Sequence, residues 1–246
     1  MKLFSASTVS KTYRPHYYSV LYETVRLAAS LKYEKISCIE FGVAGGNGLL
    51  SIEKYTKKLE KKFGVQIEIY GFDNGTGLPK SNDYRDLPFL WSEGDFEMDV
   101  KKLEKKITRS KLILGDVKET VGTFIDDYAP APIGCVFFDL DYYTSTKSAM
   151  EIFNHELINF LPRVICYYDD VIGSVNNYNG ALLAIDEYNN QNTMRKIVKD
   201  YGTVTDIKYG CNYKHVFILH LFEHLQYSLN SRNAGNVWEG IDDLSL

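Results

Sequence analysis

The sequence predicts an α/β fold: a doubly wound, mainly parallel sheet of seven strands that closes with an antiparallel hairpin. Short apolar runs alternate with longer amphipathic runs along most of the 246 residues, and this alternation is typical of parallel strands joined by helices. A glycine-rich turn follows the first apolar run, at the position where such folds bind ligands. The chain length suits one domain of this class.

Seven apolar runs have the length expected of strands, and they span residues 36–41, 66–72, 111–114, 135–140, 164–168, 204–209 and 216–222. Amphipathic spacing, capping residues and breakers predict helices over residues 16–31, 49–63, 95–107, 117–128, 142–160 and 180–189, with a short one at 194–200. This order is that of a Rossmann-like sheet covered by helices on both faces. The last two strands flank Gly210-Cys211-Asn212 and form the predicted hairpin.

The composition narrows the partners that the chain can have. The net charge is −4 and the basic residues are scattered, which argues against a nucleic-acid partner. No apolar run reaches the roughly 18 residues of a membrane span, and the N-terminus lacks the apolar core of a signal peptide. The four cysteines stand singly, which favours buried thiols in a reducing compartment. We therefore expect a cytoplasmic protein with neither a membrane nor a nucleic acid as partner.

The stretch SCIEFGVAGGNGLLS, residues 37–51, places Glu40 and four glycines between the first strand and the first core helix. Glycines allow positive φ and a close approach of backbone to ligand, and the helix N-terminus adds free N–H donors. The spacing does not match the dinucleotide fingerprint G-x-G-x-x-G, and a carboxylate before the glycines would repel a pyrophosphate but suit an ammonium or a ribose hydroxyl. The alternative is a turn without a ligand, although Glu40 would then be an awkward, partly buried charge.

The second strand ends in Asp73, beside the glycine turn, where an acid is placed to bind ribose hydroxyls. Asp-Asn-Gly is also strong turn chemistry, so a purely structural role is the alternative. The long irregular segment 74–94 that follows contains apolar and aromatic residues, which favours a functional loop over disorder. We expect this loop and residues 1–15 to close over a bound ligand.

Acidic residues follow one predicted strand after another, at Glu40, Asp73, Asp116, Asp139, Asp141, Asp169 and Asp170. The carboxyl ends of parallel strands meet at one edge of the sheet, where ligands bind. The last four acids close two strands that should be neighbours about 4.8 Å apart. Shared protons or a divalent cation such as Mg²⁺ would relieve their repulsion. Individually, Asp141 or Asp170 could instead cap the helix that follows it.

Five segments, EFGVAGGNG, GFDNGTGLP, LGDVKETV, FFDLDYYTST and YYDD, run in order from Glu40 to Asp170. Together they resemble the macrocin O-methyltransferase-like family, which are metal-dependent sugar O-methyltransferases among the class I S-adenosylmethionine-dependent methyltransferases. The resemblance implies S-adenosylmethionine bound at Glu40, Gly42, Gly45, Gly46, Asp73 and Asp116. It also implies Mg²⁺ held by Asp139, Asp169 and Asp170, with Asp141 as the general base.

The expected function is therefore an S-adenosylmethionine-dependent O-methyltransferase that methylates a hydroxyl of a sugar or another small-molecule or glycan acceptor. We expect an N-terminal arm and helix over residues 1–35, the catalytic domain over 36–222, and a polar tail over 223–246. The aromatic N-terminal helix is a candidate interface for a homo-oligomer. Two alternatives stay open. The first is an NAD(P)-dependent oxidoreductase, which the glycine spacing disfavours and whose candidate pair, Tyr143-x-x-x-Lys147, sits beside the acids. The second is a non-catalytic methyltransferase-like partner domain, against which the retained acids argue.

Overall fold

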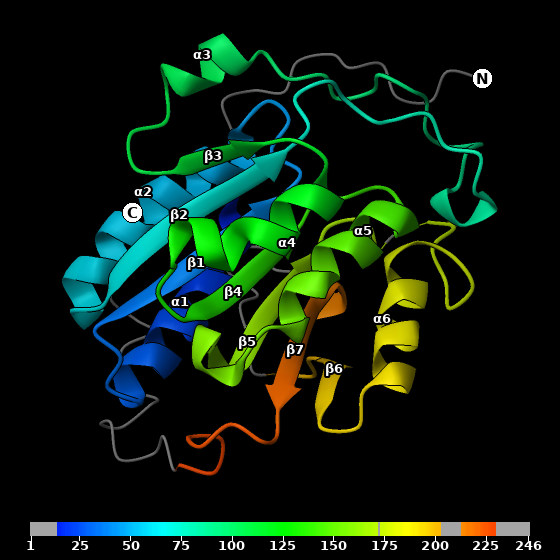
Figure 1. Ribbon diagram of the computed structural model, residues 1–246. Coiled ribbons are helices and arrows are strands. Elements are labelled where there is room, and N and C mark those ends of the chain that lie inside the picture. The colour runs from blue at the N-terminus through cyan, green and yellow to red at the C-terminus, as the bar shows by residue number, and fades with distance from the viewer. Residues whose placement is uncertain (1–13, 172, 203–212, 230–246) are drawn as a thin grey trace.

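The computed structural model describes residues 14–171, 173–202 and 213–229, and its centre is a seven-stranded sheet in the order β3-β2-β1-β4-β5-β7-β6 (Figure 1). Strand β7 pairs antiparallel with both β5 and β6, whereas the other neighbouring strands pair in parallel. The predicted fold class is confirmed. The strands are β1 Lys35–Phe41, β2 Gln66–Asp73, β3 Lys111–Leu114, β4 Ile133–Phe138, β5 Phe160–Tyr168, β6 Arg195–Lys199 and β7 Val216–Leu221.

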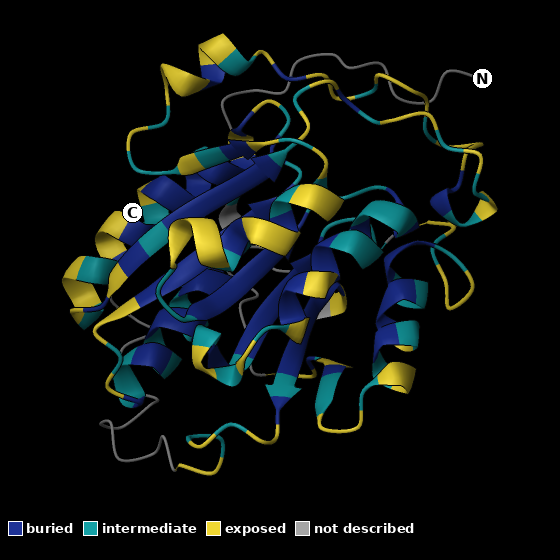
Figure 2. Ribbon diagram, viewed as in Figure 1, coloured by how far each residue is buried: buried dark blue, intermediate teal, exposed yellow. Residues whose placement is uncertain are grey.

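Helices cover both faces of the sheet, and its inner strands are mostly buried, whereas the edge strands β3 and β6 are only partly so (Figure 2). The apolar side chains of α1 Pro15–Ser30, α2 Asn47–Phe63 and α3 Val100–Glu104 share one cluster with one face of the strands. Those of α4 Val117–Tyr128, α5 Tyr143–Met150 and α6 Gly180–Gln191 share a second cluster with the other face. Among the residues that the structure describes, we find no helix with both the length and the apolarity to cross a membrane.

The predicted helix at residues 16–31 is α1, and it belongs to the core. Tyr17, Val20, Leu21 and Val25 recur at helical spacing on one face and are completely or almost completely buried. The Tyr17 ring stacks on Phe137 of β4, with the ring centroids 4.0 Å apart. This packing brings the residue just before α1 to the edge of the sheet where β4 ends.

Three predicted helices differ from the structure. The helix predicted at 194–200 is wrong, because these residues form strand β6, in which Ile197 is buried and Val198 is 45% exposed as in a one-sided strand. These residues become a strand because they pair with β7. The strand predicted at 204–209 lies outside the described residues. The helix predicted at 95–107 is shortened to α3, which begins after Asp99 because that side chain accepts the Lys102 N–H at 3.1 Å.

The helix predicted to run from residue 142 to about 160 ends at Met150. Two 3₁₀ turns, Glu151–Asn154 and Leu157–Asn159, follow it, and strand β5 begins at Phe160. The apolar residues Ile152 and Phe153 in the first turn are fully buried, so the hydrophobic pattern continues although the helix does not. Helix α5 begins at Tyr143, shortly after the carboxyl end of β4 at Phe138.

Candidate active site

The glycine turn between β1 and α2 owes its shape to two of its glycines. Gly42 has φ 82°, and a Cβ there would lie 1.9 Å from the carbonyl oxygen of Asp139, so the ends of β1 and β4 approach closely only with glycine. Gly46 caps α2 with φ 84°, and a Cβ there would overlap the Leu103 side chain of α3. Gly45 is exposed, and a Cβ at this position would meet open space.

The Asp73 carboxylate holds this turn from the neighbouring strand. Its Oδ2 accepts the backbone N–H groups of Val43 and Ala44 at 2.9 and 2.8 Å, and its Oδ1 accepts that of Gly75 at 2.7 Å. Asp73 therefore has the structural role in a turn that the Asp-Asn-Gly sequence allows. A carboxylate has about four lone-pair sites, so Asp73 keeps capacity for a ligand hydroxyl.

Glu40 lies beneath the same turn, 1% exposed and away from the cavity lining. The Tyr17 hydroxyl donates a hydrogen bond of 3.1 Å to its Oε1, while Oε2 has no partner within the described residues. Burial raises the pKa of Glu40 to about 8. A Cβ at Gly48 would lie 1.7 Å from Oε1, so the space that this carboxyl occupies depends on that glycine.

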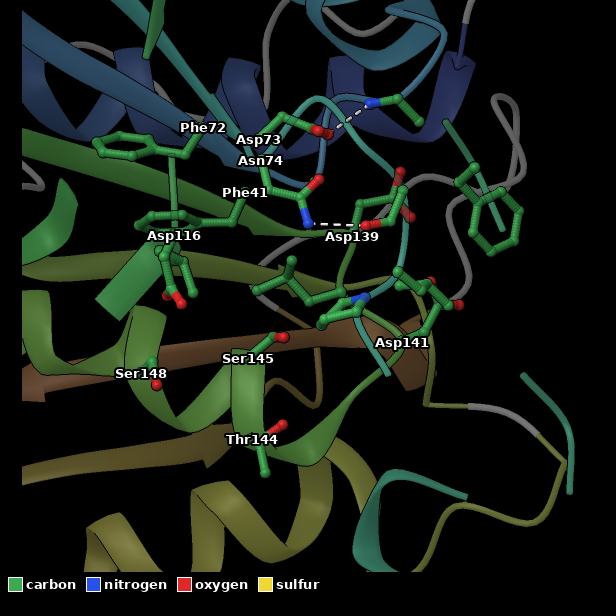
Figure 3. A pocket seen from close by; sticks show the side chains of 18 of the residues that line it. Phe41, Phe72, Asp73, Asn74, Asp116, Asp139, Asp141, Thr144, Ser145 and Ser148 are labelled. Atoms are coloured by element: carbon green, nitrogen blue, oxygen red, sulfur yellow. Dashed lines mark hydrogen bonds between the residues drawn. The ribbon is translucent and has the colours of Figure 1, made fainter. Parts of the chain in front are cut away.

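A cavity of about 500 Å³ opens at the carboxyl ends of β1, β2, β4 and β5. In the view of Figure 3, Asp139 lies between Asn74 and Asp141, with Phe41 and Phe72 at the inner end. Predicted site residues that line it are Gly42, Asp73, Asp116, Asp139, Asp141, Asp169 and Asp170, whereas Glu40, Gly45 and Gly46 do not. The edge of the sheet thus brings the acids together, as the strand order predicts.

Asp116 reaches the cavity from the start of α4. Its side chain accepts the backbone N–H of Lys118 at 2.8 Å, which is the N-cap bond of that helix. The residue follows β3, whose partner β2 ends in Asp73 beside Leu114. The cap therefore turns a second carboxylate toward the part of the cavity that Asp73 lines.

An arginine, Arg14, lies between the acids that follow β4 and β5, and no sequence pattern predicted it there. The Arg14 Nη2 lies 2.7 Å from Asp139 Oδ2, and its Nη1 lies 3.2 Å from Asp169 Oδ2 and 3.2 Å from the Tyr17 hydroxyl oxygen. The sequence signal was only that a polar arm ends at Arg14, before the first helix. Packing of α1 onto the sheet puts the guanidinium between the two strand ends.

Burial and neighbouring charges shift the pKa values of the carboxylates in this cluster in different directions. Burial raises the pKa of Asp141 to about 7 and those of Asp139 and Asp170 well above their ordinary range, although the charge of Arg14 opposes the shift of Asp139. Burial also acts on Asp169, but the charge of Arg14 and hydrogen bonds outweigh it and hold the pKa of Asp169 below its ordinary value. Asp170 Oδ2 is buried without a hydrogen-bond partner among the described residues.

The loop after β2 is tied down at both of its ends and in its middle. Leu78 forms two backbone hydrogen bonds of 2.8 Å, donating to Asp95 and accepting from Gly94. In the middle, Asp86 is 1% exposed and accepts hydrogen bonds from α5 and from Ser81, a role that sequence patterns did not indicate. The loop thereby holds Trp91 and Phe96 against the cavity.

The structural comparison assigns the fold. The calicheamicin methyltransferase CalS11 superposes on this chain with a TM-score of 0.59 and 20% sequence identity, over 82% of this chain and 77% of that one. This chain has the methyltransferase fold. Its resemblance to class I methyltransferases is thus confirmed at the level of the fold, and an identity of 20% supports nothing finer.

Other methyltransferase structures superpose less well. An apo structure of CalS11, described as a TDP-rhamnose 3'-O-methyltransferase, gives a TM-score of 0.48 at 20% identity, over 82% of this chain and 78% of that one. MycE in complex with Mg, SAH and mycinamycin VI gives 0.42 at 13% identity, over 84% and 54%. Both scores are too low to bear on function. No protein-family model and no curated protein sequence matches the chain.

The residues predicted to hold Mg²⁺ do not fit a metal in this arrangement of the methyltransferase fold. Within residues 14–171, 173–202 and 213–229, no three Asp, Glu, His or Cys side chains converge as metal ligands. Arg14 contacts one oxygen of Asp139 and one of Asp169, whereas Mg²⁺ needs oxygens at about 2.0–2.1 Å in octahedral geometry. The predicted site at Asp139, Asp169 and Asp170 therefore contains a guanidinium where a metal would approach.

Proposed function

We propose that this chain is an S-adenosylmethionine-dependent O-methyltransferase that acts on a hydroxyl of a small-molecule or glycan acceptor, a sugar being the first candidate. One observation carries the proposal: a single cavity joins the glycine turn and Asp73 to the carboxylates after β4 and β5. The methyltransferase fold supports the same reaction class. Proposed domain limits are 36–222 for the catalytic core, with α1 packed onto it.

The cofactor side of the cavity comprises Gly42, Asp73, Asn74 and Asp116. The carboxylates on this side suit S-adenosylmethionine. They accept hydrogen bonds from ribose hydroxyls, and their negative charge favours a ligand that carries a sulfonium and an ammonium. Bound S-adenosylmethionine would supply an activated methyl group. Glu40, Gly45 and Gly46 stay predicted contacts, and Glu40 would act through the turn above it because it does not line the cavity.

The acceptor side comprises the acids after β4 and β5, the start of α5 and the aromatic residues Trp91 and Phe96. The proposed step forms a bond between the acceptor oxygen and the methyl carbon while the sulfonium–methyl bond breaks. Asp141 lines the cavity and takes the hydroxyl proton as general base. Holding the hydroxyl in line with the methyl carbon supplies much of the rate acceleration.

The predicted Mg²⁺ dependence stays a prediction that the position of Arg14 does not favour, so the proposed transfer contains no metal step. Its role would have been to lower the pKa of the acceptor hydroxyl. In the proposed transfer Asp141 instead takes the hydroxyl proton as general base.

Calorimetry with S-adenosylhomocysteine and with NAD(P)⁺ tests the proposal. We expect S-adenosylhomocysteine to bind, and Asp73→Ala to weaken the binding by about 1–3 kcal/mol through a lost hydrogen bond to a charged group. Asp99→Ala, which alters a cap on α3, is the matched control. Binding of NAD(P)⁺ alone would support an oxidoreductase, and binding of neither ligand would support a non-catalytic partner domain.

A further inference from the structure

Arg14 stands where the sequence predicts a metal ion. We propose that Arg14 is the resident cation of the acidic edge, positioning Asp139 and Asp169, and that a divalent metal ion binds these carboxylates only by displacing it. The proposal concerns cation binding and holds or fails independently of the methyl-transfer reaction.

The geometry of Arg14 is that of a bridge between two strand ends. Its Nη2 contacts Asp139, after β4, at 2.7 Å, and its Nη1 contacts Asp169, after β5, at 3.2 Å. A planar guanidinium can hold two carboxylates in a fixed relation because its donors diverge from one rigid group. The three side chains are 21–31% exposed, so these ion pairs are better shielded from water than ordinary surface pairs.

Arg14 is also anchored through its backbone and through Tyr17. The Arg14 N–H donates to Ser51 Oγ on α2 at 2.8 Å, and the Ser51 hydroxyl donates to the Asn47 carbonyl at 2.6 Å. Tyr17 accepts from the Arg14 guanidinium at 3.2 Å and donates to Glu40 at 3.1 Å. Arg14 therefore links the glycine turn to the acidic edge, and its removal from the carboxylates would break an ordered set of contacts.

A metal ion and the guanidinium exclude one another at this position. Mg²⁺ or Mn²⁺ would have to approach the same carboxylates to about 2 Å, and a divalent ion a few ångströms from a guanidinium is strongly repelled in a partly buried site. Displacing Arg14 would cost its two ion pairs and its bond to Tyr17. The apparent metal affinity is reduced by that cost, so removal of the guanidinium should increase it.

Binding of Mn²⁺ to the full-length chain, followed by electron paramagnetic resonance or calorimetry, tests the proposal. Arg14→Met keeps an apolar stem and removes the charge. Arg26→Met is the matched control, because Arg26 lies on α1, which begins directly after Arg14, and pairs with Glu23 instead. We expect Arg14→Met to bind Mn²⁺ at least about tenfold more tightly than the wild type, and Arg26→Met to behave as the wild type.

Asp169→Asn in the Arg14→Met background should abolish the added affinity. Equal Mn²⁺ affinity in the wild type and in Arg14→Met would overturn the proposal, as would a failure of Arg14→Met to bind Mn²⁺ at all. If circular dichroism shows that Arg14→Met does not fold, Arg14→Gln replaces it. Arg14→Gln also removes the positive charge, so it should bind Mn²⁺ more tightly than the wild type, and unchanged affinity would contradict the proposal.

Discussion

The Asp86 carboxylate accepts two hydrogen bonds from Thr144, one from the backbone N–H at 2.8 Å and one from the hydroxyl at 2.9 Å. Thr144 lies in the first turn of α5, so an acid from the loop after β2 meets the positive end of that helix. The contact joins residues 58 positions apart and pins the loop that carries Trp91 over the cavity. This contact therefore fixes the position of the loop relative to α5, which lines the same cavity.

Asp86→Asn should loosen this loop. Loss of a buried charged acceptor that serves the N–H and the hydroxyl of Thr144 is expected to lower the free energy of unfolding by about 1–3 kcal/mol. Limited proteolysis should then cut residues 74–94 faster than in the wild type, and S-adenosylhomocysteine should restore protection if the loop closes on the ligand. Asp127→Asn, at an exposed position of α4, serves as control. Identical cleavage of all three proteins would argue against the pinning role.

Gly42→Ala and Gly45→Ala should differ sharply. The first places a Cβ 1.9 Å from the Asp139 carbonyl at positive φ, whereas the second places it in open space. We expect Gly42→Ala to lose more than the roughly 1–3 kcal/mol typical of backbone strain alone, measured by urea denaturation. Gly45→Ala should fold as the wild type does. The bulkier Gly45→Val should also leave the stability unchanged. A lower affinity of Gly45→Val for S-adenosylhomocysteine would therefore indicate contact between this position and the ligand.

Asp141→Asn should slow turnover by roughly 10²–10⁴-fold, the range for removing a general base. The shape of the side chain is kept, so calorimetric affinity for S-adenosylhomocysteine should change little. Asp116→Asn is a useful comparison, because this residue lies at the cofactor side and should alter affinity more than turnover. Full activity of folded Asp141→Asn would remove it from the proposed mechanism.

Turnover of the wild type should persist in EDTA, because Arg14 supplies the positive charge that holds Asp139 and Asp169. The measurement compares initial rates after exhaustive chelation with rates after addition of Mg²⁺. Loss of activity with EDTA and its return with Mg²⁺ would instead support the metal-dependent mechanism that the sequence resemblance implies.

Glu53 makes stability depend on pH. It is 5% exposed and accepts hydrogen bonds from Thr108, Arg109 and Ser110, on the segment before β3. Burial alone would raise its pKa, but these bonds outweigh burial and lower the pKa to about 2. A depressed folded-state pKa stabilises the protein above the unfolded-state value of about 4.5, and the contribution is lost as pH falls toward 2.

Glu53→Gln should therefore destabilise the protein by about 1–3 kcal/mol at pH 7. The difference from the wild type should shrink between pH 4.5 and 2. Urea denaturation at several pH values measures it, with Glu104→Gln at an exposed position of α3 as the control. A difference that stays constant over this range would show that charge on Glu53 is not the cause.

The sequence by itself determined the sheet, the glycine turn and the gathering of the acids. Apolar runs and their intervening helices are local patterns, and a parallel sheet brings the carboxyl ends of its strands to one edge whatever the details. Asp139, Asp141, Asp169 and Asp170 could therefore be placed together without any knowledge of contacts. The turn chemistry of Asp73 was equally local, since its Gly75 contact spans two residues.

Only the tertiary structure decided which partners these groups take. Arg14 meets Asp169 across 155 positions, and Asp86 meets Thr144 across 58, and no local pattern specifies a partner at such distances. Strand β6 was read as a helix because its five residues have no strong period of their own and become a strand by pairing with β7. The identity of the cation at the acidic edge depends on how α1 packs, which is a property of the whole core.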